Sequence, residues 1–222
     1  MREWIDQILA LAAALGLMAA QPALSHPHVW IDTRAVLHFD ERGRLTALGE
    51  EWVFDDGYAA FVVEDLDKNG DGVLSSAELQ PIIDQNTATL EKWAYFTVFK
   101  VDGRRVTLGP AADAHMDYAK DQLTFSFTLP LSQPLDVHDL NVAFSIFDPT
   151  FYIEIVPAET KPVRLEGDPK GCSAKLRPFD TTTQRFIPDT YAFSIKTDPK
   201  EPENSVGAQF AEWVDLKCLK RS

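Results

Sequence analysis

Hydrophobic and polar residues alternate along much of this chain, with the two-residue period of strands that bury one face. The stretches VWIDTRAVLHF and LTALGEEWVF alternate on either side of the polar segment ERGR, which predicts a hairpin over residues 28–54. An Asp102-Gly103 pair predicts a second hairpin within residues 95–108. Further strands are expected at residues 123–131, 140–147 and 151–156. Short strands at this spacing favour a sandwich or a barrel over a parallel sheet.

The period becomes helical between residues 55 and 95. A glycine-rich acidic segment separates two runs in which apolar residues recur every three or four positions. These residues are Tyr58, Phe61, Val62 and Leu66 in the first run and Leu79, Ile82, Ile83 and Leu90 in the second. The sequence therefore predicts a helix–loop–helix inserted in a β-rich domain that spans residues 26–160.

Residues 161–222 form a proline-rich tail, since seven of the 14 prolines lie between Pro157 and Pro202. This composition predicts irregular structure with edge strands. A last helix is expected from Asn204, which can cap it. Its apolar stripe would consist of Val206, Phe210, Trp213, Val214 and Cys218. The predicted fold class is α+β, mainly β: an antiparallel sandwich-like domain with inserted helices and a C-terminal helix.

The first 25 residues have the pattern of a secretory signal peptide. Thirteen apolar or small residues, Ile8–Ala20, would rise about 20 Å as a helix, which is short of the roughly 30 Å hydrocarbon core. Pro22 follows, and Ala23 and Ser25 supply the small residues of a cleavage site. Cleavage would leave His26 as the first residue of a periplasmic protein. No second apolar stretch is long enough to span a bilayer, so no stable membrane insertion is expected after cleavage.

The chain has two cysteines, Cys172 and Cys218. In an oxidising compartment they are expected to pair, which would close a loop of about 46 residues and link the last helix to the tail. Two buried thiols are the alternative.

Composition and charge narrow the class of protein further. With 45% hydrophobic and 25% charged residues, the chain can build a core, which excludes a disordered protein. The net charge of −13 repels phosphate backbones, so nucleic acid is not an expected partner. The same charge suits cations.

Residues 67–78, DKNGDGVLSSAE, carry the strongest chemical signal. An EF-hand loop needs oxygen ligands at positions 1, 3, 5, 7, 9 and 12 and glycine at position 6, which here is Gly72. The predicted calcium ligands are Asp67, Asn69, Asp71, the Val73 carbonyl, Ser75 and Glu78. A register beginning at Asp65 fails, because Ser76 at its position 12 lacks a carboxylate.

This loop has no second copy in the sequence, although EF-hands usually occur in pairs. Three carboxylates and a water-linked serine suggest modest affinity, in the roughly 10⁻⁴–10⁻³ M range of extracellular calcium modules. Calcium is therefore expected to be structural more than regulatory. The alternative is a solvated acidic turn that binds no ion.

The segment His26-Pro27-His28 is a second candidate metal site. The residue before proline favours extended backbone, so both imidazoles can project to one side. Imidazole nitrogens favour Zn²⁺, Ni²⁺, Co²⁺ or Cu²⁺. A solvated terminus is the alternative.

Four other residues are candidates for completing this site or are histidines elsewhere in the chain. His115 is the best placed of them, Asp148 is a weaker candidate, and His38 and His138 have the pattern of ordinary surface or capping histidines.

Four segments, HPHVWID, EWVFDDGYAAF, DKNGDGVL and IFDPTFYIEI, resemble a family of bacterial periplasmic proteins described as the periplasmic component of an uncharacterised ABC-type transport system. The resemblance runs from His26 to about Pro157. It implies transition-metal handling beside a nickel/cobalt-type permease. Only His26 and His28 are carried over as ligands.

The leading expectation is a periplasmic accessory protein that binds a divalent metal, exchanges it with a membrane permease and holds calcium in its EF-hand. One alternative is a calcium-dependent interaction module that contacts a partner through the apolar faces of the hand or through Trp30 and Trp52. Another is a copper oxidative enzyme built on an N-terminal histidine. No nucleophile elbow, P-loop or dinucleotide fingerprint occurs, so an enzyme is not expected.

Overall fold

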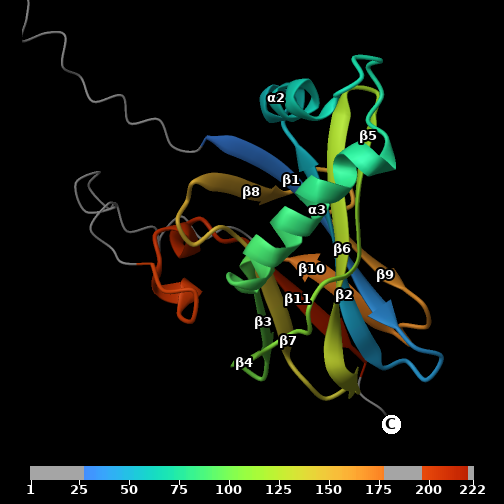
Figure 1. The fold of residues 1–222 in the computed structure, drawn as a ribbon. Coiled ribbons are helices and arrows are strands. Elements are labelled where there is room, and N and C mark those ends of the chain that lie inside the picture. Colours follow the sequence, from blue (N-terminus) through green and yellow to red (C-terminus); the bar gives the residue numbers. More distant parts are fainter. Residues whose placement is uncertain (1–27, 178–196, 220–222) are drawn as a thin grey trace, which may run out of the picture.

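Two β-sheets form the framework of the protein in the computed structural model, which describes residues 28–177 and 197–219 (Figure 1). The predicted signal peptide and His26 lie outside these residues. The first sheet contains β1 (Val29–Phe39), β2 (Leu45–Phe54), β5 (Ala112–Ala119), β6 (Gln122–Leu135), β8 (Ile153–Pro157) and β9 (Val163–Glu166). The second contains β3 (Thr97–Val101), β4 (Arg104–Val106), β7 (Val142–Ile146), β10 (Cys172–Leu176) and β11 (Trp213–Cys218). The mainly β class is confirmed, and both sheets are open, so the barrel alternative is wrong.

The hairpin predicted for residues 28–54 is confirmed as β1 and β2, which pair antiparallel from Ile31 opposite Phe54. The polar segment between them turns around Asp40, whose carboxylate accepts hydrogen bonds from the backbone N–H groups of Arg42 and Arg44 at 3.0 and 2.9 Å. These bonds, together with an ion pair to the Arg44 side chain, hold the pKa of Asp40 below its ordinary value.

The expectation of a purely antiparallel arrangement is wrong at β1. Its free edge pairs in parallel with β8, with Val29 opposite Ile153, and then with β9, with Ala35 opposite Val163. Alternation is the same for either strand direction, so the pattern of side chains did not specify this pairing.

The predicted C-terminal helix is also wrong. Residues 202–204 and 207–209 form single 3₁₀ turns, and residues 213–218 form strand β11. The inward side chains of that strand, Val214 and Leu216, alternate with outward polar ones. The segment therefore follows the two-residue period of a strand and not the spacing of three or four residues that predicted a helix.

The disulfide between Cys172 and Cys218 is confirmed. The two cysteines are register partners of the antiparallel pair β10 and β11. The bond therefore joins two strands of the second sheet, and not a helix to the tail.

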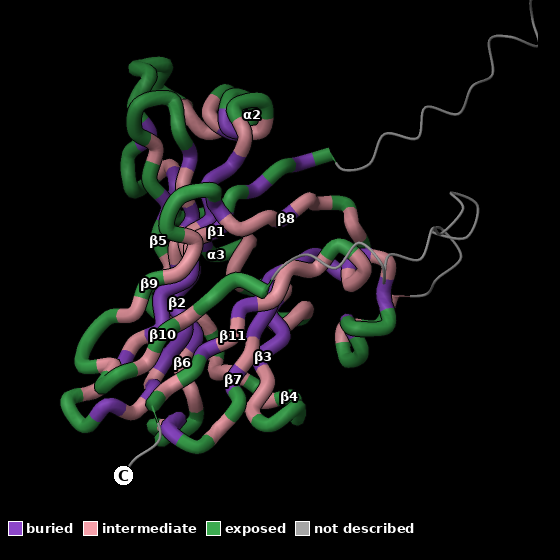
Figure 2. The backbone as a smooth tube through the Cα atoms, turned by 180° about the vertical axis from the view of Figure 1, so that it is seen from behind, coloured by how far each residue is buried: buried purple, intermediate pink, exposed green. Residues whose placement is uncertain are grey.

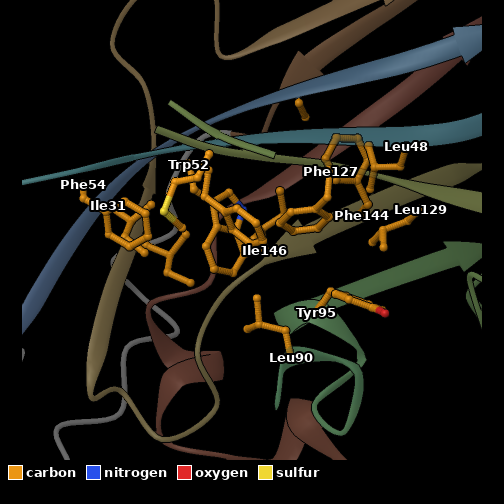
Figure 3. Packing of buried hydrophobic residues seen from close by; sticks show 14 of the residues in the cluster. Ile31, Leu48, Trp52, Phe54, Leu90, Tyr95, Phe127, Leu129, Phe144 and Ile146 are labelled. Atoms are coloured by element: carbon orange, nitrogen blue, oxygen red, sulfur yellow. The ribbon is translucent and has the colours of Figure 1, made fainter. Parts of the chain in front are cut away.

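The core lies between the sheets and continues beneath the two helices, α2 (Asp56–Leu66) and α3 (Ser76–Glu91). Figure 3 shows Trp52 and Phe127 of the first sheet facing Phe144 and Ile146 of the second, with Leu90 and Tyr95 closing one side. Figure 2 shows that buried positions follow the strands, whereas the turns between strands and the loop beyond α2 are exposed. None of the helices among the described residues combines the length and hydrophobicity needed to cross a bilayer.

A left-handed turn connects α3 to the second sheet. Ala94, Tyr95 and Phe96 have φ values of 50°, 56° and 57°, which L-residues seldom adopt in succession. The surrounding structure fixes them: the Ala111 N–H donates to the Tyr95 hydroxyl at 2.9 Å, and the Phe147 N–H donates to the Phe96 carbonyl at 2.9 Å. The exit helix of the predicted calcium loop is thereby tied rigidly to the core.

Candidate cation-binding sites

Two well-capped helices flank the loop at residues 67–78, as the sequence predicts. Asp55 caps α2 by accepting hydrogen bonds from the Gly57 and Tyr58 N–H groups at 2.9 and 3.0 Å. Ser75 caps α3, and Leu74 is buried as the apolar anchor of the loop. The loop therefore follows the C-terminal end of α2 and ends at the capped N-terminus of α3.

The first half of the loop curls around its own acidic side chains. The Asp67 carboxylate accepts hydrogen bonds from the N–H groups of Gly70, Asp71 and Gly72 at 2.8, 3.2 and 2.8 Å. The Asn69 amide oxygen accepts from the Asp71 N–H at 2.8 Å. The curl requires positive φ at Gly70 (72°) and Gly72 (77°), where glycine costs least.

Glu78 joins the two ends of the loop. Its Oε1 accepts a hydrogen bond from the Lys68 N–H at 3.1 Å, and its Oε2 accepts from the Ser75 N–H and hydroxyl at 2.9 and 2.7 Å. The hydrogen bond from the Ser75 hydroxyl is the largest of the effects that lower the pKa of Glu78. These hydrogen bonds favour the ionised form of the Glu78 carboxylate and connect Lys68 with Ser75 through it.

The six predicted ligand groups offer only oxygen, which fits a hard cation such as Ca²⁺. No group of three or more His, Cys, Asp or Glu side chains among the described residues is arranged as a metal site. The carboxylates of Asp67 and Glu78 accept hydrogen bonds from backbone N–H groups of the loop instead. Because an ionised carboxylate has about four lone-pair sites, these hydrogen bonds do not by themselves prevent ligation.

The structure places His28 beside a segment more than a hundred residues away in sequence. Its N–H donates to the Tyr152 carbonyl at 2.9 Å, and its ring centroid lies 4.7 Å from that of Tyr152. Both side chains are exposed, at the start of the parallel pair β1 and β8. Two of the four segments that carry the family resemblance, HPHVWID and IFDPTFYIEI, therefore meet at one edge of the first sheet.

A third segment of the family resemblance, EWVFDDGYAAF, lies at the same edge of the first sheet. Asp55 pairs with Trp30: the Trp30 N–H donates to the Asp55 carboxylate at 3.0 Å, and the Asp55 N–H donates to the Trp30 carbonyl at 3.0 Å. Burial, and secondarily the phenol of Tyr152, raises the pKa of Tyr58 in the first turn of α2. Sequence reasoning missed this aromatic neighbourhood of His28, because it depends on long-range pairing.

Asp148 organises the loop that presents Tyr152. It is 4% exposed, and its carboxylate accepts hydrogen bonds from the N–H groups of Thr150, Tyr152 and Ile153 at 2.8, 3.0 and 3.0 Å. The Asp148 carboxylate therefore holds its own loop in shape, and the sequence-based suggestion that it could also ligate a metal stays a prediction. An Asp between two apolar segments is a sequence signal for a side chain that holds a turn by hydrogen bonds to nearby backbone N–H groups.

Of the histidines that the structure describes, His115 and His38 lie far from His28 along the first sheet. His115 aligns through Ser126 and Glu51 with Arg34 of β1. Three strand spacings, about 14 Å, and six residues along β1, about 20 Å, therefore separate it from His28. His38 lies 3.7 Å from the Glu166 carboxylate, and His138 is buried, with its Nδ1 2.8 Å from the Asp136 carboxylate. The structure does not bring His115 to the N-terminal site.

Sequence reasoning also missed a buried carboxyl, that of Glu50. Only 2% of this residue is exposed, between the two sheets. Its oxygens lie 2.6 Å from the Thr97 hydroxyl and 2.9 Å from the Trp52 indole nitrogen. Burial raises its pKa to about 7. The signal was present, because Glu50 shares the inward face of β2 with Leu48 and Trp52.

The fold and its disulfide define a mainly β, extracytoplasmic protein that carries a helix–loop–helix between β2 and β3, since such bonds persist in oxidising compartments. Residues 11–218 match the family described as "Protein of unknown function (DUF1007)", and the chain belongs to this family. It is similar to an "Uncharacterized protein" of Haemophilus influenzae, with 24% identity over 206 residues that cover 92% of this chain and 96% of that protein. No solved structure matches the chain.

Proposed function

We propose that this protein is a periplasmic, divalent-cation-binding accessory of a transition-metal transport system, with a calcium ion in loop 67–78. The loop carries the proposal: it lies between two capped helices, is curled by Asp67 and is closed by Glu78. The negative charge of the chain, −13, adds a general attraction for cations.

Calcium would be held by the side chains of Asp67, Asn69, Asp71, Ser75 and Glu78 and by the Val73 carbonyl. The bound ion would supply positive charge to carboxylates that otherwise repel one another. Glu78 is the residue that transmits binding to the fold, because its Oε1 contacts Lys68 at the loop entrance and its Oε2 caps α3. The left-handed turn at residues 94–96 then ties the far end of α3 to the core, so calcium is expected to stabilise the fold and not to move a domain.

Replacing Glu78 with glutamine is expected to weaken calcium binding at least about tenfold, because an amide cannot act as a bidentate anionic ligand. Isothermal titration calorimetry of the chain beginning at His26 should show one site with a Kd of roughly 10⁻⁴–10⁻³ M before the change. Glutamine is accepted in a capping box, so α3 should keep its start.

Glu64→Gln is the matched control, because Glu64 is an exposed residue of α2 outside the loop. It removes the same charge and should leave the Kd unchanged. Equal calcium affinity in the Glu78→Gln and Glu64→Gln proteins would remove the loop from the proposal.

The transition-metal site would use the imidazoles of His26 and His28, with the terminal amine of His26 as a third nitrogen after signal-peptide cleavage. The exposure of His28, which directly precedes β1, supports this assignment. Histidine nitrogens suit Zn²⁺, Ni²⁺, Co²⁺ or Cu²⁺, so this site and the oxygen-lined loop would bind different metals. Capture and release of the ion near a permease would be the mechanism.

The chain beginning at His26 is expected to bind about one equivalent of Zn²⁺, Ni²⁺ or Cu²⁺, and a His26→Ala, His28→Ala double variant should lose that binding. Calorimetry with each metal measures this directly, with calcium already saturating. His115→Ala is the control, since His115 is exposed on β5 far from His28. Undiminished binding by the double variant would refute the N-terminal site.

A calcium-dependent interaction module is the second candidate function. Trp30, Tyr152 and Phe61 favour it, with 48%, 50% and 70% of their surfaces exposed. The expectation that Trp52 contacts a partner is wrong, because this residue is 2% exposed and lies in the core. Calcium binding without transition-metal binding would favour this function over the first.

A further inference from the structure

A hollow on the outer face of the second sheet carries positive charge on an acidic molecule. It forms above Ala143 of β7, whose register partners are Lys100 of β3 and Asp215 of β11. Val142 and Phe144 point into the core, so Ala143 faces outward with only a methyl group among longer side chains. The result is a cavity of about 260 Å³ lined by Lys100, Asn141, Arg177, Trp213, Asp215 and Lys217.

The cationic side chains are held in place around the Trp213 ring. Lys100 Nζ lies 4.8 Å from the ring centroid, and Arg177 Cζ lies 5.7 Å from it. Arg177 also donates to both oxygens of Asp215, at 3.2 and 2.6 Å, and Lys100 forms an ion pair with Glu203. These contacts reduce the conformational freedom that the cations would lose on binding a ligand.

Lys217 gives the hollow its surplus charge. It lines the cavity, is exposed, and forms no ion pair with any residue that the structure describes. The lining thus has three cations and one carboxylate, whereas the chain as a whole has a charge of −13. Because Glu203 and Asp215 offset Lys100 and Arg177, the ammonium group of Lys217 leaves these residues with a surplus of one positive charge, which favours an anion in the hollow.

We propose that the hollow above Ala143 is a binding site for an oxyanion, the carboxylate or phosphate group of a small ligand or of a lipid headgroup. Lys217 and the remaining N–H groups of Arg177 would donate hydrogen bonds to the anion, and the edge of Trp213 would contact its apolar part. The cavity volume suits one small group. The site is separate from the proposed cation sites and does not depend on them.

The test follows the Trp213 indole and Arg177 Nε resonances by nuclear magnetic resonance during three titrations. The probes are inorganic phosphate, citrate, and vesicles of phosphatidylcholine with or without phosphatidylglycerol. A saturable shift with phosphate or citrate supports the proposal and identifies a free ligand. Binding confined to vesicles with phosphatidylglycerol supports it and identifies a lipid headgroup.

Two variants test the hollow itself. Ala143→Leu fills the cavity without changing charge and should weaken binding at least about tenfold, and Lys217→Gln should weaken it about fivefold or more. Lys175→Gln is the matched control: Lys175 is exposed on the same sheet, opposite Asp215, but does not line the cavity. It should change affinity less than twofold.

Lys217→Gln keeps the test decisive if Ala143→Leu folds poorly. Absence of a saturable shift with all three probes would overturn the proposal. Equal effects of Lys217→Gln and Lys175→Gln would overturn it as well, because they would indicate diffuse attraction and not a defined site.

Discussion

Replacing Glu50 with glutamine is expected to abolish a fall in stability of about 3 kcal/mol between pH 4.5 and pH 7. The pKa of Glu50 is raised from 4.5 to about 7 in the folded protein, so the folded state keeps a proton that the unfolded chain has lost. The stabilisation is fully present below pH 4.5, declines as pH rises and is lost above about pH 7. Chemical denaturation at several pH values measures the difference between the two proteins.

Glutamine is the right replacement because of the hydrogen bonds around Glu50. The neutral carboxyl can donate to the Thr97 hydroxyl, which then donates to the Tyr95 carbonyl at 2.9 Å, while the Trp52 N–H donates to the other oxygen. A glutamine amide can satisfy the same partners. The Glu50→Gln protein should therefore be as stable between pH 4.5 and pH 7 as the wild-type protein with a protonated Glu50.

Glu51→Gln is the control for this experiment. Glu51 is the adjacent residue, but its carboxylate forms a partly exposed ion pair with Arg34 at 2.8 Å. Its loss should cost about 1 kcal/mol or less and leave the pH dependence in place. The same slope between pH 5 and pH 7 in the wild-type and Glu50→Gln proteins would contradict the assignment.

Reduction of the Cys172–Cys218 disulfide is expected to lower the free energy of unfolding by about 4 kcal/mol. The bond spans a sequence separation of 46 residues, and the estimate is the chain entropy that such a crosslink removes from the unfolded state. Urea unfolding with and without dithiothreitol provides the measurement.

A Cys172→Ala, Cys218→Ala double variant separates this effect from others of the reductant. It should unfold at the midpoint of the reduced wild-type protein and should not respond to dithiothreitol. An unchanged midpoint on reduction of the wild type would show that the disulfide adds no stability beyond the hydrogen-bonded pairing of β10 with β11.

Local signals in the sequence predicted the features that depend on neighbouring residues. The alternation on both sides of ERGR identified β1 and β2, and the capping residues Asp55 and Ser75 fit the predicted helices. The pairing of Cys172 with Cys218 was predicted because only two cysteines were present.

Features that depend on long-range pairing could not be predicted in this way. Nothing local places His28 beside Tyr152, because a parallel pair leaves no turn between its strands to identify. The prediction of a C-terminal helix failed for a different reason. The spacing of Val214 and Cys218 fits a helical stripe and a strand equally well, and the pairing of β11 with β7 and β10 decides between the two.

The parallel partners of β1 have a consequence for the biogenesis of the protein. Val29 pairs with Ile153, so the first strand to be synthesised waits on the order of 120 residues for its neighbour on that side. Until then this edge of β1 exposes an unpaired row of amide and carbonyl groups, and the first sheet is incomplete. Late pairing of this edge leaves β1 able to pair with another chain, so the interval before β8 joins the sheet is one in which aggregation is favoured.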